Sequence, residues 1–320
     1  MASNRNIGFD IARSISMIYI VGMLHLSEYT GNAISHNPVC VTLIWAALGV
    51  FTFLSSYLLA SRYHFATNAD IITFYKKRLL RFYPLFFISS LLLALIGFNS
   101  WVETGKGLIG ISPFWEPQQH TLWYIATLIF LYLATPLLAA DKFVIEALSF
   151  VLFLGIAFLI DFIFGSVDPR FFYYYLVYFI GIISTRYLPK FSKRILHSKW
   201  SFWACIPFIL MLILISRTNS RLLMLGGGYL GIFVILVIAT SLTCYVQKYV
   251  LLQKGISFIS YGSMCAYLFH REIYWSFLKL WTPLNPIVMG IYLFFIAFPV
   301  VLFCAFYIQK KYDFLFLSVK

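Results

Sequence analysis

Apolar stretches of about twenty residues alternate with short polar connections along almost the whole chain. An α-helix needs roughly 20 mostly apolar residues to cross the hydrocarbon core of a bilayer, so each stretch predicts one membrane span. Long unbroken apolar runs also argue against a β-barrel, whose short strands alternate between apolar and polar residues. We therefore expect an all-α, polytopic membrane protein with about ten transmembrane helices in one bundle. The predicted spans lie at about residues 8–28, 39–61, 82–99, 121–140, 144–164, 171–188, 200–216, 222–246, 256–278 and 286–309.

Composition agrees with this prediction and excludes a soluble enzyme. The chain is 62% hydrophobic and only 11% charged, whereas about a quarter of the residues of a soluble domain carry charge. The five cysteines show neither CxxC nor Cys/His ligand spacing, so we expect no disulfide and no bound metal. We expect a single integral-membrane domain over residues 1–320. The first apolar stretch lacks a small-residue cleavage site, which predicts that it is retained rather than removed as a signal peptide.

Basic residues collect in alternate connections. Seventeen Lys and Arg side chains fall on one side of the predicted topology and five on the other. Because cytoplasmic loops are enriched in Lys and Arg, both termini are predicted to be cytoplasmic. Because the basic residues alternate between connections in this way, we interpret the net charge of +13 as a signal of membrane orientation and not of nucleic-acid binding. The longest inner connection, residues 186–199, is a basic linker, and the longest outer one, residues 99–120, has the length of a lid or an interfacial segment.

The first predicted span carries ionisable side chains near both ends. Arg13 and His25 lie twelve positions apart, which is roughly 18 Å along a helix axis and more than half of the hydrocarbon core. Ionisable groups inside an apolar span normally face the interior of a bundle or a wet cavity. Glu28 follows His25 by three positions and shares its helical face. This pattern predicts a buried reaction path enclosed by the other helices.

Five local patterns follow one another along the chain. They are FDIARSISM with its following histidine (9–25), FTFLSSYLL (51–59), FYKKRLLRFYP (74–84), HTLWYIATLIFLYLATP (120–136) and ISYGSMCAYLFH (259–270). In this order, and over nearly the whole chain, they resemble the acyltransferase family 3 membrane proteins. Members of that family O-acetylate bacterial surface polysaccharides and related acceptors, which is the activity that the resemblance implies here.

Two positions depart from the family pattern. The family usually places ten residues between the arginine and the histidine of its first span, whereas eleven separate Arg13 from His25. One extra residue turns a side chain by about 100° on an ideal helix. Either a local bulge absorbs the extra residue, or the two groups do not both occupy the family's positions. The second departure is Ser56, where the family commonly has a glycine at a close helix contact.

The resemblance implies a catalytic role for His25. Acyl transfer from a thioester to a hydroxyl needs a base that takes the hydroxyl proton, and imidazole titrates near neutral pH. Glu28 is the second predicted catalytic residue, because it is placed to orient the other nitrogen of the ring. The alternative for His25 is a hydrogen bond to a neighbouring helix, and the alternative for Glu28 is a solvated position at the outer end of the span.

Arginines on the inner side are predicted to bind the donor. Arg78 and Arg81 form the Arg-x-x-Arg element of the family, and guanidinium groups bind phosphate oxygens through paired hydrogen bonds. With Arg13 they are expected to hold the phosphates of cytoplasmic acyl-CoA. The positive-inside rule already explains their lysine neighbours, and the alternative for Arg13 is an intramembrane ion pair with Asp10.

Four side chains on the outer side are predicted to bind the acceptor or to line the active site. His120 and Trp123 begin one span, and His270 and Arg271 end another, at a depth similar to that of His25. An arginine at this depth is costly unless it is paired or faces an aqueous pocket. Each of the four has the alternative role of a polar group at the membrane interface.

Together with the apolar spans, the resemblance implies an integral protein of the bacterial cytoplasmic (inner) membrane that acts in polysaccharide biosynthesis as an O-acyltransferase. It would move an acyl group, expected to be acetyl, from acyl-CoA as co-substrate to a hydroxyl of a cell-surface glycan or lipid-linked saccharide. No bound cofactor and no nucleic-acid partner are expected, and membrane lipid surrounds the chain.

Two rival interpretations remain open. A transporter or flippase for a glycan precursor or small solute would favour inverted halves and spans broken by Gly or Pro at matching places. LGGGYLG at residues 225–231 gives one such interruption, without a mate in the first half. A non-catalytic partner in glycan assembly is favoured by the altered spacing between Arg13 and His25.

Overall fold

The computed structural model describes residues 6–31, 37–116, 118–140, 142–187 and 203–317. These residues form helices joined by short connections, and none of them lies in a β-strand. The predicted all-α class is therefore confirmed. The basic linker predicted at residues 186–199 lies almost entirely outside the described residues.

Six helical segments are long and apolar enough to cross a membrane. Two shorter apolar helices, α6 (Trp123–Leu138) and α10 (Cys205–Thr218), occupy two further predicted spans. Helices α8 (Pro169–Arg186) and α12 (Val250–Leu280) occupy the last two and carry more polar side chains. The prediction of ten spans is thus supported for six. These six are α3 (Pro38–Ala60), α4 (Asn68–Leu95), α7 (Phe143–Phe164), α11 (Arg221–Lys248) and the composite segments Ile7–Thr30 and Pro286–Phe316.

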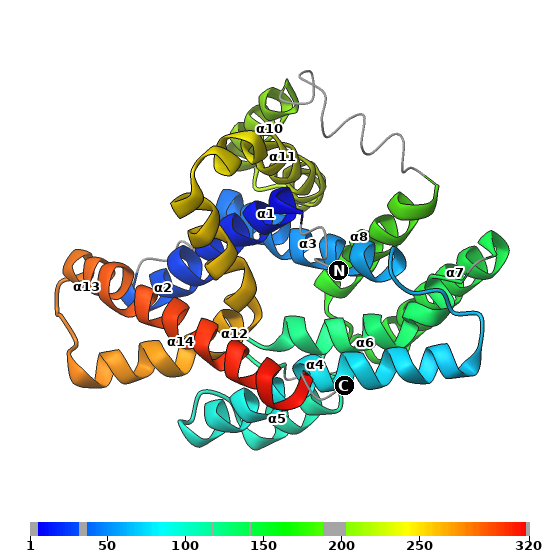
Figure 1. Ribbon diagram of the computed structural model, residues 1–320, viewed down its shortest axis with the longest axis horizontal. Helices are drawn as coiled ribbons and strands as arrows, with labels where there is room; N and C mark the ends of the chain where they lie inside the picture. Colours follow the sequence, from blue (N-terminus) through cyan, green and yellow to red (C-terminus); the bar gives the residue numbers. More distant parts are fainter. Residues whose placement is uncertain (1–5, 32–36, 117, 141, 188–202, 318–320) are drawn as a thin grey trace. The chain divides into compact units, whose positions relative to one another are not determined.

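The described residues form two compact units, and the boundary between them falls within α3. The first unit takes the described residues of 1–51 and 189–312. In this unit α1 (Ile7–Met17) packs against α11 and α12, and α10 lies beside α11 (Figure 1). Helix α12 also packs along α14 (Phe298–Tyr312). The first helix of the chain therefore shares one core with helices of its last third.

Glycines in α11 allow close packing and do not break the helix, which is continuous over its whole length. A Cβ atom added at Gly227 would lie 2.8 Å from the methyl group of Thr42, and one added at Gly231 would lie 2.7 Å from the Cβ of Ala46. Both glycines thus let α11 approach α3 at a distance that a side chain would prevent. The stretch at residues 225–231 is not the broken span that a transporter would favour.

The second unit takes the described residues of 52–188 and 313–320. Helix α6 packs against α4, α7 and α8, and α6 and α7 are neighbours in Figure 1. The predicted outer connection contains a short helix, α5 (Trp101–Leu108), which packs against α4 and α6. The connection is therefore a structured element of this unit.

Helix α4 begins well before the predicted span. Thr67 and Asp70 form a capping box, in which the backbone N–H of Thr67 donates to the Asp70 carboxylate at 2.9 Å and the N–H of Asp70 donates to the Thr67 hydroxyl at 3.3 Å. Arg78 and Arg81 consequently lie within a helix, three positions apart and on one face. The sequence prediction missed this start because the first turns of α4 are polar.

An ion pair links three helices of the second unit. Arg186, near the end of α8, pairs with the buried carboxylate of Glu146 on α7 at 2.5 Å. The same guanidinium donates hydrogen bonds to the carbonyl oxygens of Ala139 and Ala140, which follow the end of α6. Arg186 is the first residue of the predicted basic linker, and the structure gives it a packing role.

Ser56 packs at a position where the facing helix supplies the glycine. Its side chain is fully buried and its hydroxyl donates to the carbonyl oxygen of Phe53 at 3.0 Å. A Cβ atom added at Gly181 of α8 would lie 1.9 Å from that hydroxyl oxygen and 2.8 Å from the Phe53 carbonyl oxygen. The small residue that a close helix contact requires is therefore present on α8.

Replacing Gly181 with alanine is expected to destabilise the protein by about 1–3 kcal/mol, the usual cost of overpacking. The added methyl group meets a backbone carbonyl oxygen that cannot rotate away. Thermal unfolding of the purified protein in detergent measures the effect. Gly155→Ala on α7 is the matched control, because nothing lies within 4 Å of a Cβ atom there. Equal unfolding temperatures for the two variants would contradict the packing argument.

Candidate active site

A π-helical segment separates Arg13 from His25. It is η1 (Ile18–Leu24), and the backbone N–H of His25 donates to the carbonyl oxygen of Ile20, five residues earlier. A hydrogen bond of this span holds one more residue per turn than the α-helical bond does. The structure therefore contains the local bulge that the eleven-residue spacing allowed.

Contacts from two other helices fix this bulge. The hydroxyl of Tyr274 on α12 donates to the carbonyl oxygen of Val21 at 3.0 Å. A Cβ atom added at Gly22 would lie 2.9 Å from the ring of Phe298, so the glycine allows that ring to pack against the bulge. The position of His25 on its helix is thus set by tertiary contacts.

Deleting Met23 is expected to convert the bulge into regular α-helix and to leave the fold and activity largely intact. Met23 lies within η1 and its side chain is 55% exposed, so the deletion removes little packing and restores the spacing usual in the family. Inserting one alanine after Met23 is the control, because it adds a second extra residue and turns His25 by about 100°. Acyl-transfer activity and unfolding temperature measure both. Equal loss in the two variants would contradict this account.

The imidazole rings of His25 and His270 stack on one another. Their centroids are 4.7 Å apart and their planes differ by 6°. His270 is fully buried, while His25 is half-buried. The Nδ1 atom of His270 lies 2.8 Å from the carbonyl oxygen of Tyr267. Because a carbonyl oxygen only accepts, Nδ1 carries the proton and Nε2 of the neutral ring is an acceptor. This Nε2 atom is buried and has no hydrogen-bond partner among the described residues.

Arg271 directly follows His270 in the sequence and forms an ion pair with Glu28. Arg271, which is 2% exposed, donates to the Glu28 carboxylate at 2.5 Å, and the Glu28 side chain is 29% exposed. The guanidinium carbon of Arg271 lies 5.5 Å from the centre of the Tyr29 ring. The arginine is therefore paired, as its depth in the predicted span requires. The predicted action of Glu28 on the His25 ring stays a prediction.

Tyrosines complete the surroundings of the rings, and the sequence analysis did not single them out. The Tyr267 ring lies 6.2 Å from His25, and the Tyr274 ring lies 6.0 Å from His270. Tyr267, His270, Arg271 and Tyr274 have helical spacing and share one face of α12. That periodicity is the signal in the sequence that would have identified them.

Asp10 and Ser14 attach α1 to α12 near Arg13. The hydroxyl of Ser260 donates to the Asp10 carboxylate at 2.7 Å, and the hydroxyl of Ser14 donates to the carbonyl oxygen of Ile256 at 3.2 Å. Arg13 is half-buried on the same helix. Its predicted binding of the donor is not tested by these contacts.

The second unit contains the other four predicted site residues. Arg81 is exposed on α4, and the guanidinium carbon of Arg78 lies 5.7 Å from the centre of the Tyr63 ring. His120 is exposed, and its backbone N–H donates to the side chain of Asn99.

Trp123 is buried beneath an arginine that the sequence analysis did not assign to the site. The guanidinium carbon of Arg170 lies 3.7 Å from the centre of the Trp123 ring. Arg170 also pairs with Asp168 at 2.5 Å and donates to Gln118 at 2.9 Å. The Asp-Pro-Arg order at the start of α8 indicates a helix cap. Nothing in the sequence indicates that Arg170 contacts Trp123, because the two residues lie far apart along the chain.

Comparison with known protein families assigns the chain to one of them. A family model described as an acyltransferase domain matches residues 6–310. The chain belongs to acyltransferase family 3. No curated protein and no solved structure matches it. As a member of acyltransferase family 3 that has several membrane-length apolar helices, the protein is an integral-membrane acyltransferase.

Proposed function

We propose that the protein is an O-acyltransferase that moves an acyl group, expected to be acetyl, from cytoplasmic acyl-CoA to a hydroxyl of a cell-surface glycan or lipid-linked sugar. The observation that carries this proposal is the stacked His25–His270 pair beside the Arg271–Glu28 ion pair. Acyl transfer to a hydroxyl needs a base and a group that stabilises the oxyanion, and the imidazole and the fixed cation are suited to these two roles.

His25 is the better base of the two histidines because it is accessible. His270 is fully buried and its Nδ1 proton is held by a carbonyl oxygen, whereas His25 is half-buried. His25 would take the proton of the acceptor hydroxyl as its oxygen attacks the thioester carbonyl carbon. The carbon–sulfur bond then breaks, and the proton passes from His25 to the leaving thiolate to give free CoA and the O-acyl product.

Arg271 is suited to stabilise negative charge that develops during the attack. Charged groups that are already in place act most strongly in a site that excludes water, and Arg271 is almost fully buried. Glu28 would act as a positioning residue that holds the guanidinium group. The unpaired Nε2 of His270 offers an acceptor that a substrate hydroxyl or amide can meet.

The donor arginines are tested by kinetics with acyl-CoA. If Arg81 binds a donor phosphate, Arg81→Ala removes a charged hydrogen bond worth about 1.5–3 kcal/mol, and KM for acetyl-CoA should rise about tenfold or more. Lys77→Ala, another exposed basic position on α4, is the matched control and should change KM little. An unchanged KM in both Arg78→Ala and Arg81→Ala would remove the donor assignment.

One reconstitution experiment separates the three functional interpretations. The full chain is placed in vesicles with labelled acetyl-CoA outside and a lipid-linked saccharide in the membrane. Labelled acceptor supports the acyltransferase. Movement of saccharide across the bilayer without label would support a flippase, and neither result would support a non-catalytic partner. Mass analysis of surface glycans from cells with and without the protein then identifies the acceptor.

A further inference from the structure

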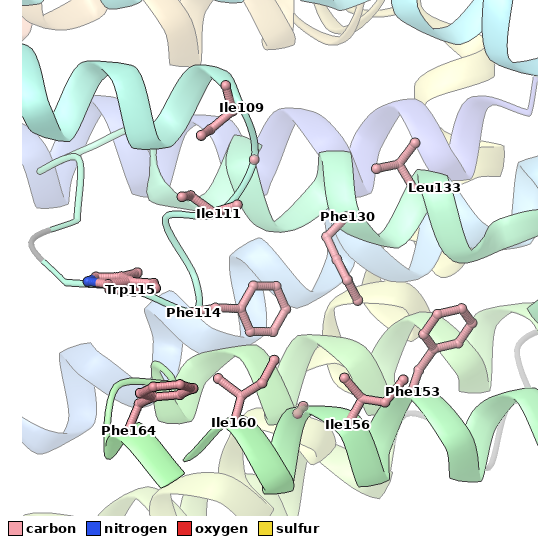
Figure 2. A pocket seen from close by; sticks show the side chains of 12 residues that line it. Ile109, Ile111, Phe114, Trp115, Phe130, Leu133, Phe153, Ile156, Ile160 and Phe164 are labelled. Atoms are coloured by element: carbon pink, nitrogen blue, oxygen red, sulfur yellow. The ribbon is translucent and has the colours of Figure 1, made fainter.

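The second unit contains an apolar cavity of about 450 Å³, within the size range of ligand sites in proteins. Its wall is formed by the connection after α5, by α6 and by α7. Figure 2 shows Phe114 and Trp115 reaching into it from the connection, Phe130 from α6, and Ile160 and Phe164 from α7. The ligand that fits this lining is a hydrocarbon chain.

The length of the cavity matches one leaflet of a membrane. Along α7 its lining runs from Phe153 to Phe164, a distance of about 16 Å at the rise of an α-helix. The hydrocarbon core of a bilayer is about 30 Å thick, so one leaflet measures about half of that. A phospholipid acyl chain has this length, while a polyprenyl tail is much longer.

The cavity is bordered by apolar side chains that are not covered by protein. Ile109 is 69% exposed, Trp115 is 57% exposed and Phe164 is 62% exposed. Helix α7 as a whole is largely exposed in its most apolar stretch. In a membrane such side chains contact lipid, so a lipid chain has direct access to the cavity.

A positive charge lies beside one end of this lining. The ammonium group of Lys106 is 6.0 Å from the centre of the Trp115 ring, and it donates to the backbone carbonyl of Glu116. Lys106 is partly exposed, and an ammonium group has three donors. Tryptophan and lysine together are typical of the membrane interface, where lipid phosphates lie.

We propose that this cavity binds one acyl chain of a membrane phospholipid whose phosphate contacts Lys106. The bound lipid would fill the space between α7 and the connection after α5 and so hold that connection in place. The inference is independent of the acyl-transfer proposal, because it concerns binding alone and uses none of the residues assigned to transfer.

Native mass spectrometry of the full chain extracted with its lipids tests the cavity. The wild type should retain one phospholipid, and Ala157→Trp should lose it, because Ala157 is 1% exposed in the wall and a larger side chain fills the space. Leu159→Trp on the same helix, 57% exposed and outside the lining, is the matched control. Retention in Ala157→Trp, or equal loss in both variants, would overturn the proposal.

A second experiment tests the phosphate contact and does not alter the core. Delipidated protein is offered phosphatidylglycerol and a monoglucosyl-diacylglycerol with the same acyl chains. The wild type should prefer the phospholipid about fivefold, the effect expected from one lysine beside an anionic headgroup, and Lys106→Gln should abolish the preference. No preference in the wild type, or displacement of the phospholipid by equimolar polyprenyl phosphate, would overturn the assignment.

Discussion

His25→Ala is expected to lower acyl transfer by about 10²–10⁴-fold, the range contributed by a general base, with an unchanged amount of folded protein. The half-buried ring of His25 packs against His270, and alanine removes both the base and one half of the stack. Transfer of labelled acetyl from acetyl-CoA to the acceptor measures the loss.

The matched control for this prediction is His64→Ala. His64 is exposed and lies outside every candidate site, so its loss should leave transfer near the wild-type rate. Protein level and unfolding temperature are measured for both variants to exclude a folding defect. Wild-type transfer by His25→Ala at normal protein level would remove His25 as the base.

The second large effect is expected from the Arg271–Glu28 pair. Glu28→Leu should destabilise the protein by about 3 kcal/mol, because it removes the carboxylate partner of a buried guanidinium group. The value lies at the low end of the range for buried pairs, since the Glu28 side chain is 29% exposed. Thermal unfolding of the purified protein in detergent checks it, and transfer should be lost as well.

A double-substituted variant separates the stability effect from the chemical one. Replacing both members by apolar residues, Glu28→Leu with Arg271→Met, removes the buried charge together with its partner and should recover most of the stability. Transfer should not recover, because the fixed cation is absent. Recovery of transfer in the double variant would show that the pair only stabilises the fold.

The fold class and the approximate positions of the helices could be predicted from hydropathy alone. The ten predicted spans are supported for only six, because α6 and α10 are shorter, α8 carries more polar side chains, and α12 has a polar face that is turned into the protein. Its buried residues include His270 and Arg271. Each polar or charged side chain that a helix contributes to the candidate site lowers the mean hydropathy of that helix.

The site was predictable only in part. His25, Glu28, His270 and Arg271 were selected as candidates because ionisable side chains are rare in apolar spans, and the structure shows them in two contacting pairs. The pairing of Glu28 with Arg271 could not be predicted, since it depends on how the segment Ile7–Thr30 packs against α12. Likewise, the sequence left the bulge at η1 as one of two alternatives, because the contact of Tyr274 with Val21 that holds the bulge joins residues far apart in the chain.

The partners of the ion pair are 243 residues apart in the chain. Ribosomes add about 5–20 residues per second, so Glu28 emerges on the order of tens of seconds before Arg271 is synthesised. During that interval the first helix is present without the residues that enclose it. The Arg271–Glu28 pair can therefore form only after most of the chain has been synthesised, and a chain that ends before Arg271 lacks this contact.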